Sequence, residues 1–259
     1  MKGLNMIGVS AFILFTLQGM AVADGPFGPP QPLSKEEGGL STAIGYGRYE
    51  REYQNGKEQV FRQNQGYSQL GYGKKNWEIF GRIGIADLEI LDAFRPSLGA
   101  TVTSKNNFDD TGNWFGTLGV KGFYPFNNLI GIGAFIQGST YFGDFTDHVS
   151  GTNNGAPFVT EFKVSRWWDV NFGLSLQVTV PMGLKIYAGP YASYSEADGS
   201  LSPAVPGLLS DTGSFNIRKG TNLGGFAGIY FPLSHGFHLS VEGQYSKNFS
   251  IGTAVTYSY

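Results

Sequence analysis

The feature that most constrains the fold is a long, strict alternation of apolar and polar side chains over residues 168–180. Its apolar positions are Trp168, Val170, Phe172, Leu174, Leu176, Val178 and Val180, and its other positions are Asp169, Asn171, Gly173, Ser175, Gln177 and Thr179. Successive side chains of a strand point to opposite faces, so this pattern predicts one strand with an apolar and a polar face. Strands of soluble proteins usually span only ~5–6 residues, whereas crossing hydrocarbon takes ~9–11 residues. The pattern therefore predicts a membrane-spanning strand with Leu174 facing lipid and Asn171, Ser175 and Gln177 facing the interior.

Similar alternation recurs along the chain. The other predicted strands are 40–49, 60–73, 77–86, 114–126, 130–142, 184–195, 215–233, 237–246 and 249–259. Only 60–73 is ambiguous, because Gln and Asn dilute both of its faces. In hydrocarbon every backbone N–H and C=O must be paired, and helices or closed barrels alone satisfy this. The sequence therefore predicts an all-β fold, a closed antiparallel up-and-down transmembrane β-barrel of about ten strands, or of eight if 60–73 fails.

Composition agrees with this prediction. Glycine accounts for 39 of 259 residues and aromatic residues for 15%, while charged residues make up only 15%, against the usual ~25%. The chain has no cysteine, which excludes a lipid-modified cysteine, a c-type haem attachment and disulfides. A net charge of −2 gives no reason to expect nucleic acid as a partner. No cofactor or metal motif is evident, so none is expected.

The N-terminal segment predicts export. Lys2 is followed by an apolar stretch at 7–17 and by the small-residue triplet Ala21-Val22-Ala23, the pattern of a cleaved signal peptide. The predicted organisation is a signal peptide over 1–23, a flexible periplasmic lead-in over the proline-rich 24–39, and the barrel over 40–259.

The links between predicted strands fall into two alternating classes. Short turns lie at 74–76, 126–129, 181–183 and 234–236, and long polar links at 50–59, 88–113, 144–157 and 196–214. Short periplasmic turns and long extracellular loops are typical of outer-membrane barrels. One link departs from this pattern, because Lys247-Asn248 is a tight turn where a loop is expected.

Two groups of aromatic residues predict the membrane interfaces. Those near the short turns are Trp77, Tyr124, Phe231 and Phe237; those near the long links are Tyr141, Trp167, Trp168 and Tyr194. The adjacent Trp167 and Trp168 also leave open a platform for a carbohydrate.

The last strand carries a resemblance. The chain ends Ala254-Val255-Thr256-Tyr257-Ser258-Tyr259, which resembles the C-terminal signal by which outer-membrane barrels are recognised for assembly, although most of these end in Phe. The whole chain is similar to the small outer-membrane barrels of Gram-negative bacteria, which include OmpA-like domains, OmpX-like proteins and opacity-type surface proteins. The resemblance implies a bacterial outer-membrane location. It also implies outer-membrane lipid, lipopolysaccharide and the barrel-assembly machinery as partners, with an unknown extracellular ligand.

The polar faces predict a lumen containing charges of both signs. The inward charged residues are Glu78, Arg82, Lys121, Asp169, Lys185, Arg218 and Glu242, and the inward rings are Tyr187, Tyr191, Phe226 and Tyr230. Barrels of about eight strands are filled by side chains, and channels appear at about sixteen. We therefore expect at least one ion pair inside a filled lumen, with Lys185 meeting Glu242 or Glu78, and Asp169 meeting Arg218. The alternative is a narrow polar pathway.

Two polar clusters are candidates for a catalytic or metal site. His238, Ser240 and Glu242 resemble the constellation of outer-membrane lipid A deacylases, in which a base activates a serine, but they are predicted to point into the lumen at the periplasmic end. Asp144, Asp147 and His148 form too small a set for a recognisable metal site, and the paired motifs of outer-membrane aspartate-type proteases are not evident. Catalytic, cofactor-binding and metal-ligating residues are therefore expected to be absent.

The sequence thus favours a non-enzymatic outer-membrane β-barrel with surface-exposed loops and a structural or surface-interaction role. A narrow porin-like channel for small solutes or ions is the first alternative. An outer-membrane hydrolase of the lipid A deacylase or protease type is the second.

Overall fold

A computed structural model of the chain describes residues 27–32, 38–54, 58–94, 100–102, 105–203 and 213–259. Within these ranges, the side chains of 51–54, 58, 100 and 218–221 are left undescribed. The predicted signal peptide, 1–23, lies outside the described residues. In the described part of the chain, no helix has both the length and the apolar character needed to cross a membrane.

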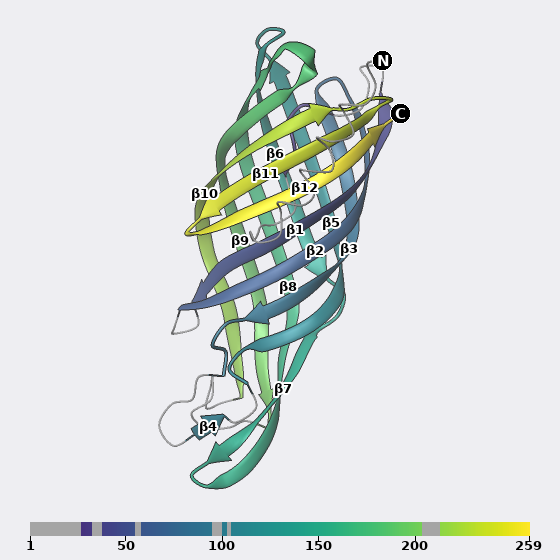
Figure 1. The fold of residues 1–259 in the computed structure, drawn as a ribbon. Coiled ribbons are helices and arrows are strands. Elements are labelled where there is room, and N and C mark those ends of the chain that lie inside the picture. Colours follow the sequence, from purple (N-terminus) through teal and green to yellow (C-terminus); the bar gives the residue numbers. More distant parts are fainter. Residues whose placement is uncertain (1–26, 33–37, 55–57, 95–99, 103–104, 204–212) are drawn as a thin grey trace, which may run out of the picture.

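Ten long antiparallel strands form a closed barrel (Figure 1). They are β1 (Gly39–Gln54), β2 (Glu58–Lys74), β3 (Trp77–Ile90), β5 (Phe108–Pro125), β6 (Ile130–Tyr141), β8 (Ala156–Thr179), β9 (Lys185–Ser202), β10 (Ser214–Pro232), β11 (Phe237–Ser246) and β12 (Asn248–Ser258). Each pairs with the next along the chain, and the pairing of β12 with β1, from Ser41↔Ser258 to Arg48↔Ile251, closes the ring. The prediction of ten strands is confirmed, and the ambiguous 60–73 lies in β2.

Three smaller elements complete the described fold. β7 (Phe145–Asn153) pairs with the first part of β8, β4 (Ala100–Val102) pairs with β7, and η1 (Pro181–Gly183) is a single 3₁₀ turn. β4 and β7 lie at one tip of the molecule, at the opposite end from the start of β1 and the end of β12 (Figure 1).

The two ends of the barrel differ. The four predicted short turns join β2–β3, β5–β6, β8–β9 and β10–β11 at the end where β1 begins and β12 stops; we call this the turn end. At the other end β8 runs for 24 residues, whereas β11 has 10. The tight turn at Lys247, which has a φ of 72°, is confirmed.

The expectation of long polar links at this second end is wrong in large part. Strands β1 and β2 continue to within three undescribed residues of each other, and 144–157 contains most of the β7–β8 hairpin. The strands continue because backbone groups outside a membrane are still satisfied by ladder pairing. What changes there is the chemistry of the two faces.

The predicted register of the wall is confirmed. Leu174 is 43% exposed on the outer face, while Asn171, Ser175 and Gln177 are buried. A slip of one residue would have inverted every one of these side chains. Trp77, Tyr124, Phe231 and Phe237 are also outward and exposed near the turn end, as expected of an aromatic belt.

A bulge in β8 places the two adjacent tryptophans in different surroundings. The register with β9 shifts between Ser165 and Trp168, and Arg166 has a φ of 52°. As a result Trp167 is 2% exposed inside the barrel, whereas Trp168 is 39% exposed outside and packs against Tyr194. Trp167 and the buried Tyr141 therefore do not belong to the second belt, and the two tryptophans cannot form one carbohydrate platform.

Beyond the level of this bulge the inside of the barrel becomes apolar. On β3 the inward residues Ala86, Leu88 and Ile90 are fully buried, while Asp87 and Glu89 between them are partly exposed. We call this part the extension; its residues are 86–94, 105–111, 145–164, 197–203 and 213–217. Its core cluster includes Leu88, Ile90, Phe94, Phe108, Phe145, Val149, Phe162, Val164, Leu201 and Ile217. The sequence shows this core at alternate positions, in phase with the membrane-level pattern on β3 but in the opposite phase on β8, where the bulge between Ser165 and Trp168 lies between the two levels.

Candidate functional site

The lumen contains five of the charged residues that were predicted to point inward: Glu78, Arg82, Lys121, Asp169 and Glu242. Its best-defined charge contact is a buried ion pair. Glu78 on β3 and Lys121 on β5 are direct register partners, with 3.2 Å between Lys121 Nζ and Glu78 Oε1. Both side chains are almost completely buried. Burying one of these charges alone would be costly, because its lost hydration would not be replaced. The expectation of at least one ion pair inside the barrel is confirmed.

The predicted partners of Lys185 are wrong. Within the described residues no carboxylate lies within 4.0 Å of Lys185, whose Nζ instead lies 5.1 Å from the centre of the Tyr230 ring. The predicted contact of Asp169 with Arg218 falls on a side chain outside the described ones. Asp169 accepts a hydrogen bond of 2.8 Å from Asn171 Nδ2.

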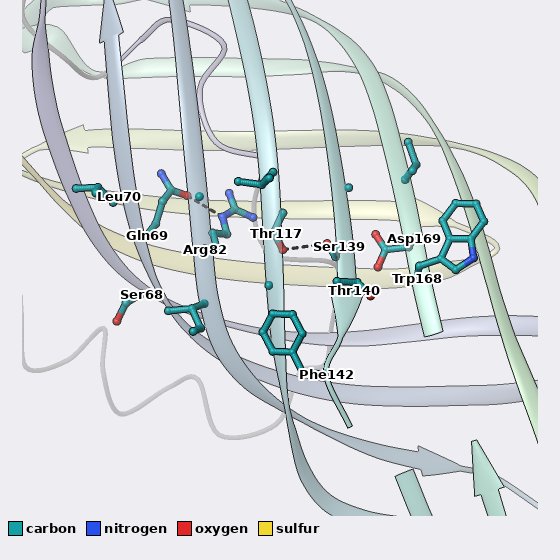
Figure 2. Close-up of a pocket in the computed structure, with 16 residues that line it drawn as sticks. Ser68, Gln69, Leu70, Arg82, Thr117, Ser139, Thr140, Phe142, Trp168 and Asp169 are labelled. Atoms are coloured by element: carbon teal, nitrogen blue, oxygen red, sulfur yellow. Dashed lines mark hydrogen bonds between the residues drawn. The ribbon is translucent and has the colours of Figure 1, made fainter. Parts of the chain in front are cut away.

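The middle of the lumen is a polar network. Arg82 Nε donates to Gln69 Oε1 at 2.7 Å, and the guanidinium lies 4.9 Å from the ring centres of both Tyr67 and Phe80. Figure 2 shows this bond beside the 2.9 Å contact of Thr117 with Ser139. Next to this network, Tyr49, Tyr67, Arg82 and Phe115 are among the residues lining a cavity of ≈ 10 Å³, about the room of one water molecule.

A segment near the N-terminus occupies the lumen at the turn end. Phe27 N–H and Gly28 N–H donate to the two carboxylate oxygens of Glu242 at 2.8 and 3.0 Å. Further along, Lys121 Nζ donates to Pro29 O at 3.4 Å, and Gln177 Nε2 to Gln31 Oε1 at 3.0 Å. We call residues 27–32 the lumen segment.

An aromatic cluster surrounds the first residue of this segment. The Phe27 ring centre lies 4.2 Å from that of Phe135, 5.1 Å from that of Phe226 and 5.2 Å from that of Tyr191. Phe27 is 2% exposed. The sequence predicted that residues 27–32 belong to a lead-in outside the barrel, whereas the structure places them in the lumen. Burial of the Phe27 ring favours this position, because an aromatic side chain gains free energy by leaving water.

Glu242 is the polar centre of this end. Besides the two backbone amides it accepts hydrogen bonds of 2.9 Å each from Tyr187 Oη and Gln244 Nε2. Four donors thus reach a carboxylate that is 1% exposed, which is how a buried acid is satisfied.

His238, Ser240 and Glu242 lie on the lumen side of β11, as predicted, but each has a different neighbour. The His238 ring stacks on Tyr230 with 4.9 Å between centres, Ser240 Oγ donates to Ala254 O at 3.3 Å, and Glu242 holds the lumen segment. A catalytic serine needs a base within ~2.6–3.2 Å, and no hydrogen bond joining Ser240 to His238 is found among the described contacts. This arrangement gives no support to the deacylase alternative.

The cluster of Asp144, Asp147 and His148 is dispersed. Asp147 accepts from Lys105 Nζ at 2.6 Å, Asp144 pairs with Lys163 at 2.6 Å, and His148 Nε2 lies 3.5 Å from Glu161. In the part of the chain that the structure describes, no three His, Asp or Glu residues are placed to hold a metal ion.

The outer wall carries a shallow groove of about 800 Å³. Leu70, Phe142 and Trp168 are exposed along it (Figure 2). The exposed Leu118 and the glycines at positions 81, 116 and 138 also line it. Its exposed side chains are mainly apolar and face the surroundings of the barrel, as lipid-facing side chains do.

Sequence reasoning missed the lumen segment. Its signal was an isolated aromatic residue, Phe27, followed by Gly28-Pro29-Pro30 within a proline-rich stretch. Alternation could not reveal it, because the segment is not a strand.

No protein-family model matches the chain, and no curated protein matches it. Among solved structures it is similar to the translocator domain of the autotransporter NalP from Neisseria meningitidis, with a TM-score of 0.51 and 12% identity over 85% of this chain and 88% of that one. It also matches the outer membrane protease OmpT from Escherichia coli, with a TM-score of 0.48 and 12% identity over 86% and 96% of the two chains. An outer membrane channel from Pseudomonas putida F1 gives 0.48 and 10% over 90% and 99%. At such identities the likeness concerns the barrel fold alone.

Proposed function

We propose that this chain is a non-enzymatic bacterial outer-membrane β-barrel with a closed lumen, whose folded extension faces the outside of the cell in a structural or surface-interaction role. The observation that carries the proposal is that side chains pack inside the barrel at three levels. These are the lumen segment with its aromatic cluster at the turn end, the Arg82 network in the middle, and the apolar core in the extension. The proposal keeps the chain within the broad class of small outer-membrane barrels that its sequence resembles.

The outer face supports a membrane location. Large apolar side chains are exposed on many strands around the ring, among them Leu40, Ile44, Leu70, Ile79, Ile83, Leu118, Ile136, Phe172, Leu174, Leu176, Ile186, Leu223, Ile229 and Val255. A soluble monomer rarely exposes a continuous apolar patch larger than a few hundred Å². Lipid is therefore the environment that this face fits.

The orientation follows from the unequal ends. Outer-membrane barrels have short turns on the periplasmic side and longer segments outside. We accordingly assign the turn end to the periplasm and the extension to the cell exterior. Any surface partner would then meet the outward polar residues of the extension, such as Asp87, Glu89, Glu161 and Lys163.

Conductance in planar lipid bilayers tests the closed lumen. The purified chain is expected to give no steady single-channel current, and a sixteen-stranded porin in the same lipid serves as the conducting control. Stable current steps from the chain would instead support the narrow-channel alternative. One observation favours that alternative: Gln137 Oε1, Asn171 Oδ1 and Ser175 Oγ face the lumen without a hydrogen-bond partner among the described residues.

The non-enzymatic part of the proposal is tested separately. Lipid A is extracted from cells that produce either the unmodified chain or the Ser240→Ala variant, and its acyl chains are compared by mass spectrometry. Ser175→Ala, which removes a lumen hydroxyl outside the trio, is the matched control. Identical lipid A from all three supports the proposal, and acyl loss that depends on Ser240 alone would refute it.

A further inference from the structure

The lumen segment contacts the barrel wall through side chains, as a bound ligand would, and not through strand pairing. The ten-strand ring is closed by its own strand pairs. Within the described residues, no backbone–backbone hydrogen bond joins 27–32 to a strand. The segment is held instead by side chains of β5, β8 and β11, through Lys121, Gln177 and Glu242. Its removal would therefore leave the ladder of the wall intact.

The site recognises consecutive backbone amides. Both oxygens of the buried Glu242 carboxylate are engaged by the N–H groups of Phe27 and Gly28. Gly28 has a φ of +76°, in the left-handed region, which glycine enters without the steric cost that other residues incur. The geometry thus selects glycine after the aromatic residue.

The site also recognises the residues on either side of this glycine. The Phe27 ring lies among Phe135, Tyr191 and Phe226. Pro30 lies against Gly133, where an added Cβ would overlap Pro30 Cβ. The φ of each proline is fixed before binding, so a proline-rich segment loses little conformational entropy when it enters this site.

We propose that the turn-end half of the lumen is a binding site for peptides of the form aromatic-Gly-Pro-Pro. The site is occupied in cis by the lumen segment and accepts the same peptide in trans when that segment withdraws. Withdrawal removes two of the four donors to the buried Glu242, and a buried carboxylate requires replacement donors. This inference goes beyond the proposed function, because it assigns a ligand to the interior of the barrel.

The test uses the full-length chain in detergent and a fluorescein-labelled peptide with the sequence of residues 27–32. The double variant Phe27→Ser with Pro30→Ser keeps the chain length but weakens the cis segment. It is expected to bind the peptide, as measured by fluorescence anisotropy. The unmodified chain should bind at least about tenfold more weakly, because a tethered segment competes at an effective concentration in the mM range.

Two controls make the result specific. Adding Gly133→Leu to the double variant is expected to abolish binding, and replacing Phe by Ala in the peptide should weaken binding by about tenfold or more. Folding of each variant is verified by circular dichroism and by heat-dependent electrophoretic mobility. A folded double variant that does not bind the peptide would overturn the proposal, as would equal binding by the unmodified chain or by the Gly133→Leu variant.

A second measurement avoids the double variant. The chain has no cysteine, so Pro32→Cys provides a single thiol at the end of the lumen segment. Millimolar peptide should displace the segment and accelerate maleimide labelling of this thiol, whereas the Phe→Ala peptide should not. An unchanged labelling rate would overturn the proposal.

Discussion

The membrane-level barrel and the extension share strands β3, β5, β8, β9 and β10 but have opposite interiors. On β3 the buried residues Glu78 and Arg82 lie at the level where the outer face is apolar (the apolar belt), and Leu88 and Ile90 lie in the extension. The phase of the alternation does not change along this strand, yet the inside passes from polar to apolar. On the outer face the exposed Ile83 and Ile85 give way to Asp87 and Glu89.

The difference separates what strand geometry determines, which is the alternation, from what the surrounding solvent determines, which is the polarity of each face. Strand geometry requires only that alternate side chains point inward. Lipid outside the barrel requires an apolar outer face and leaves the lumen for polar groups. Water outside the extension requires polar side chains there and makes an apolar core favourable. The change of chemistry between Ile85 and Asp87 therefore predicts the level at which β3 leaves the hydrocarbon.

The largest effect is expected from placing a charge in the core of the extension. Phe162 on β8 is 1% exposed. Phe162→Asp loses ~3–5 kcal/mol of packing and buries an unpaired carboxylate, so we expect the extension to unfold locally. Hydrogen–deuterium exchange of the β7 and β8 amides should rise to near the rate of an unfolded chain.

The matched control lies three residues away on the same strand. Val159 is outward and 64% exposed, so Val159→Asp should change the stability of the extension by less than about 0.5 kcal/mol. Equal disruption by the two variants would contradict an apolar interior opposite a polar exterior.

The next largest effect is expected in the lumen, where charge is required. Lys121→Met leaves the buried Glu78 without its lysine partner and should lower the free energy of unfolding by about 3–5 kcal/mol. The double variant Glu78→Leu with Lys121→Met should restore most of this loss. Urea unfolding of the barrel from lipid vesicles measures both, and a double variant no more stable than Lys121→Met would contradict the pairing.

Introducing a charge on the outer face should have different effects on stability in the two regions. Leu174 and Val159 are both outward on β8, the first at the level of the apolar belt and the second in the extension. Leu174→Arg should cost about 2–4 kcal/mol if this position lies near the bilayer midplane, whereas Val159→Arg should cost less than about 0.5 kcal/mol. Similar losses in unfolding experiments would show that both positions meet the same solvent.

The smallest effect is expected at the ion pair between Lys163 of the extension and Asp144 next to it. The hydrogen bond with Asp144, followed by the charge of Asp144, raises the pKa of Lys163 above its ordinary value. The contribution of this pair is therefore fully present below the usual lysine pKa and is lost only as the pH rises through the raised value. Lys163→Met should change stability only slightly, and equally at pH 7 and pH 9, by the same exchange measurement. A difference that disappears between these two pH values would contradict the direction of the shift.

The sequence predicted the barrel because its wall is periodic. The alternation over 168–180 identified β8 and its two faces, and parity alone identified Glu78, Lys121 and Glu242 as inward residues. Their partners were not predictable, since the height of each residue depends on strand tilt and on bulges such as the one at Arg166. That is why Lys121, and not Lys185, meets Glu78.

The extension and the lumen segment were missed for different physical reasons. Leu88 and Ile90 continue the alternation, but the charged residues next to them led to the prediction of a polar loop over 88–113. The lumen segment has no periodicity at all, and its position depends on contacts with residues more than 90 positions away, such as Lys121 and Glu242. A pattern within the segment cannot encode those contacts.

A cysteine scan along β8 tests the central claim most directly. Single cysteines are introduced into this cysteine-free chain at positions from Val159 to Val178. After reconstitution into vesicles, each is probed with a lipid-soluble and with a water-soluble thiol reagent. Alternate positions from Trp168 to Val178 should meet lipid, the outward positions 159, 161 and 163 should meet water, and position 162 should meet neither. Lipid contact that continues to position 159, or ready access of water to position 162, would contradict the account.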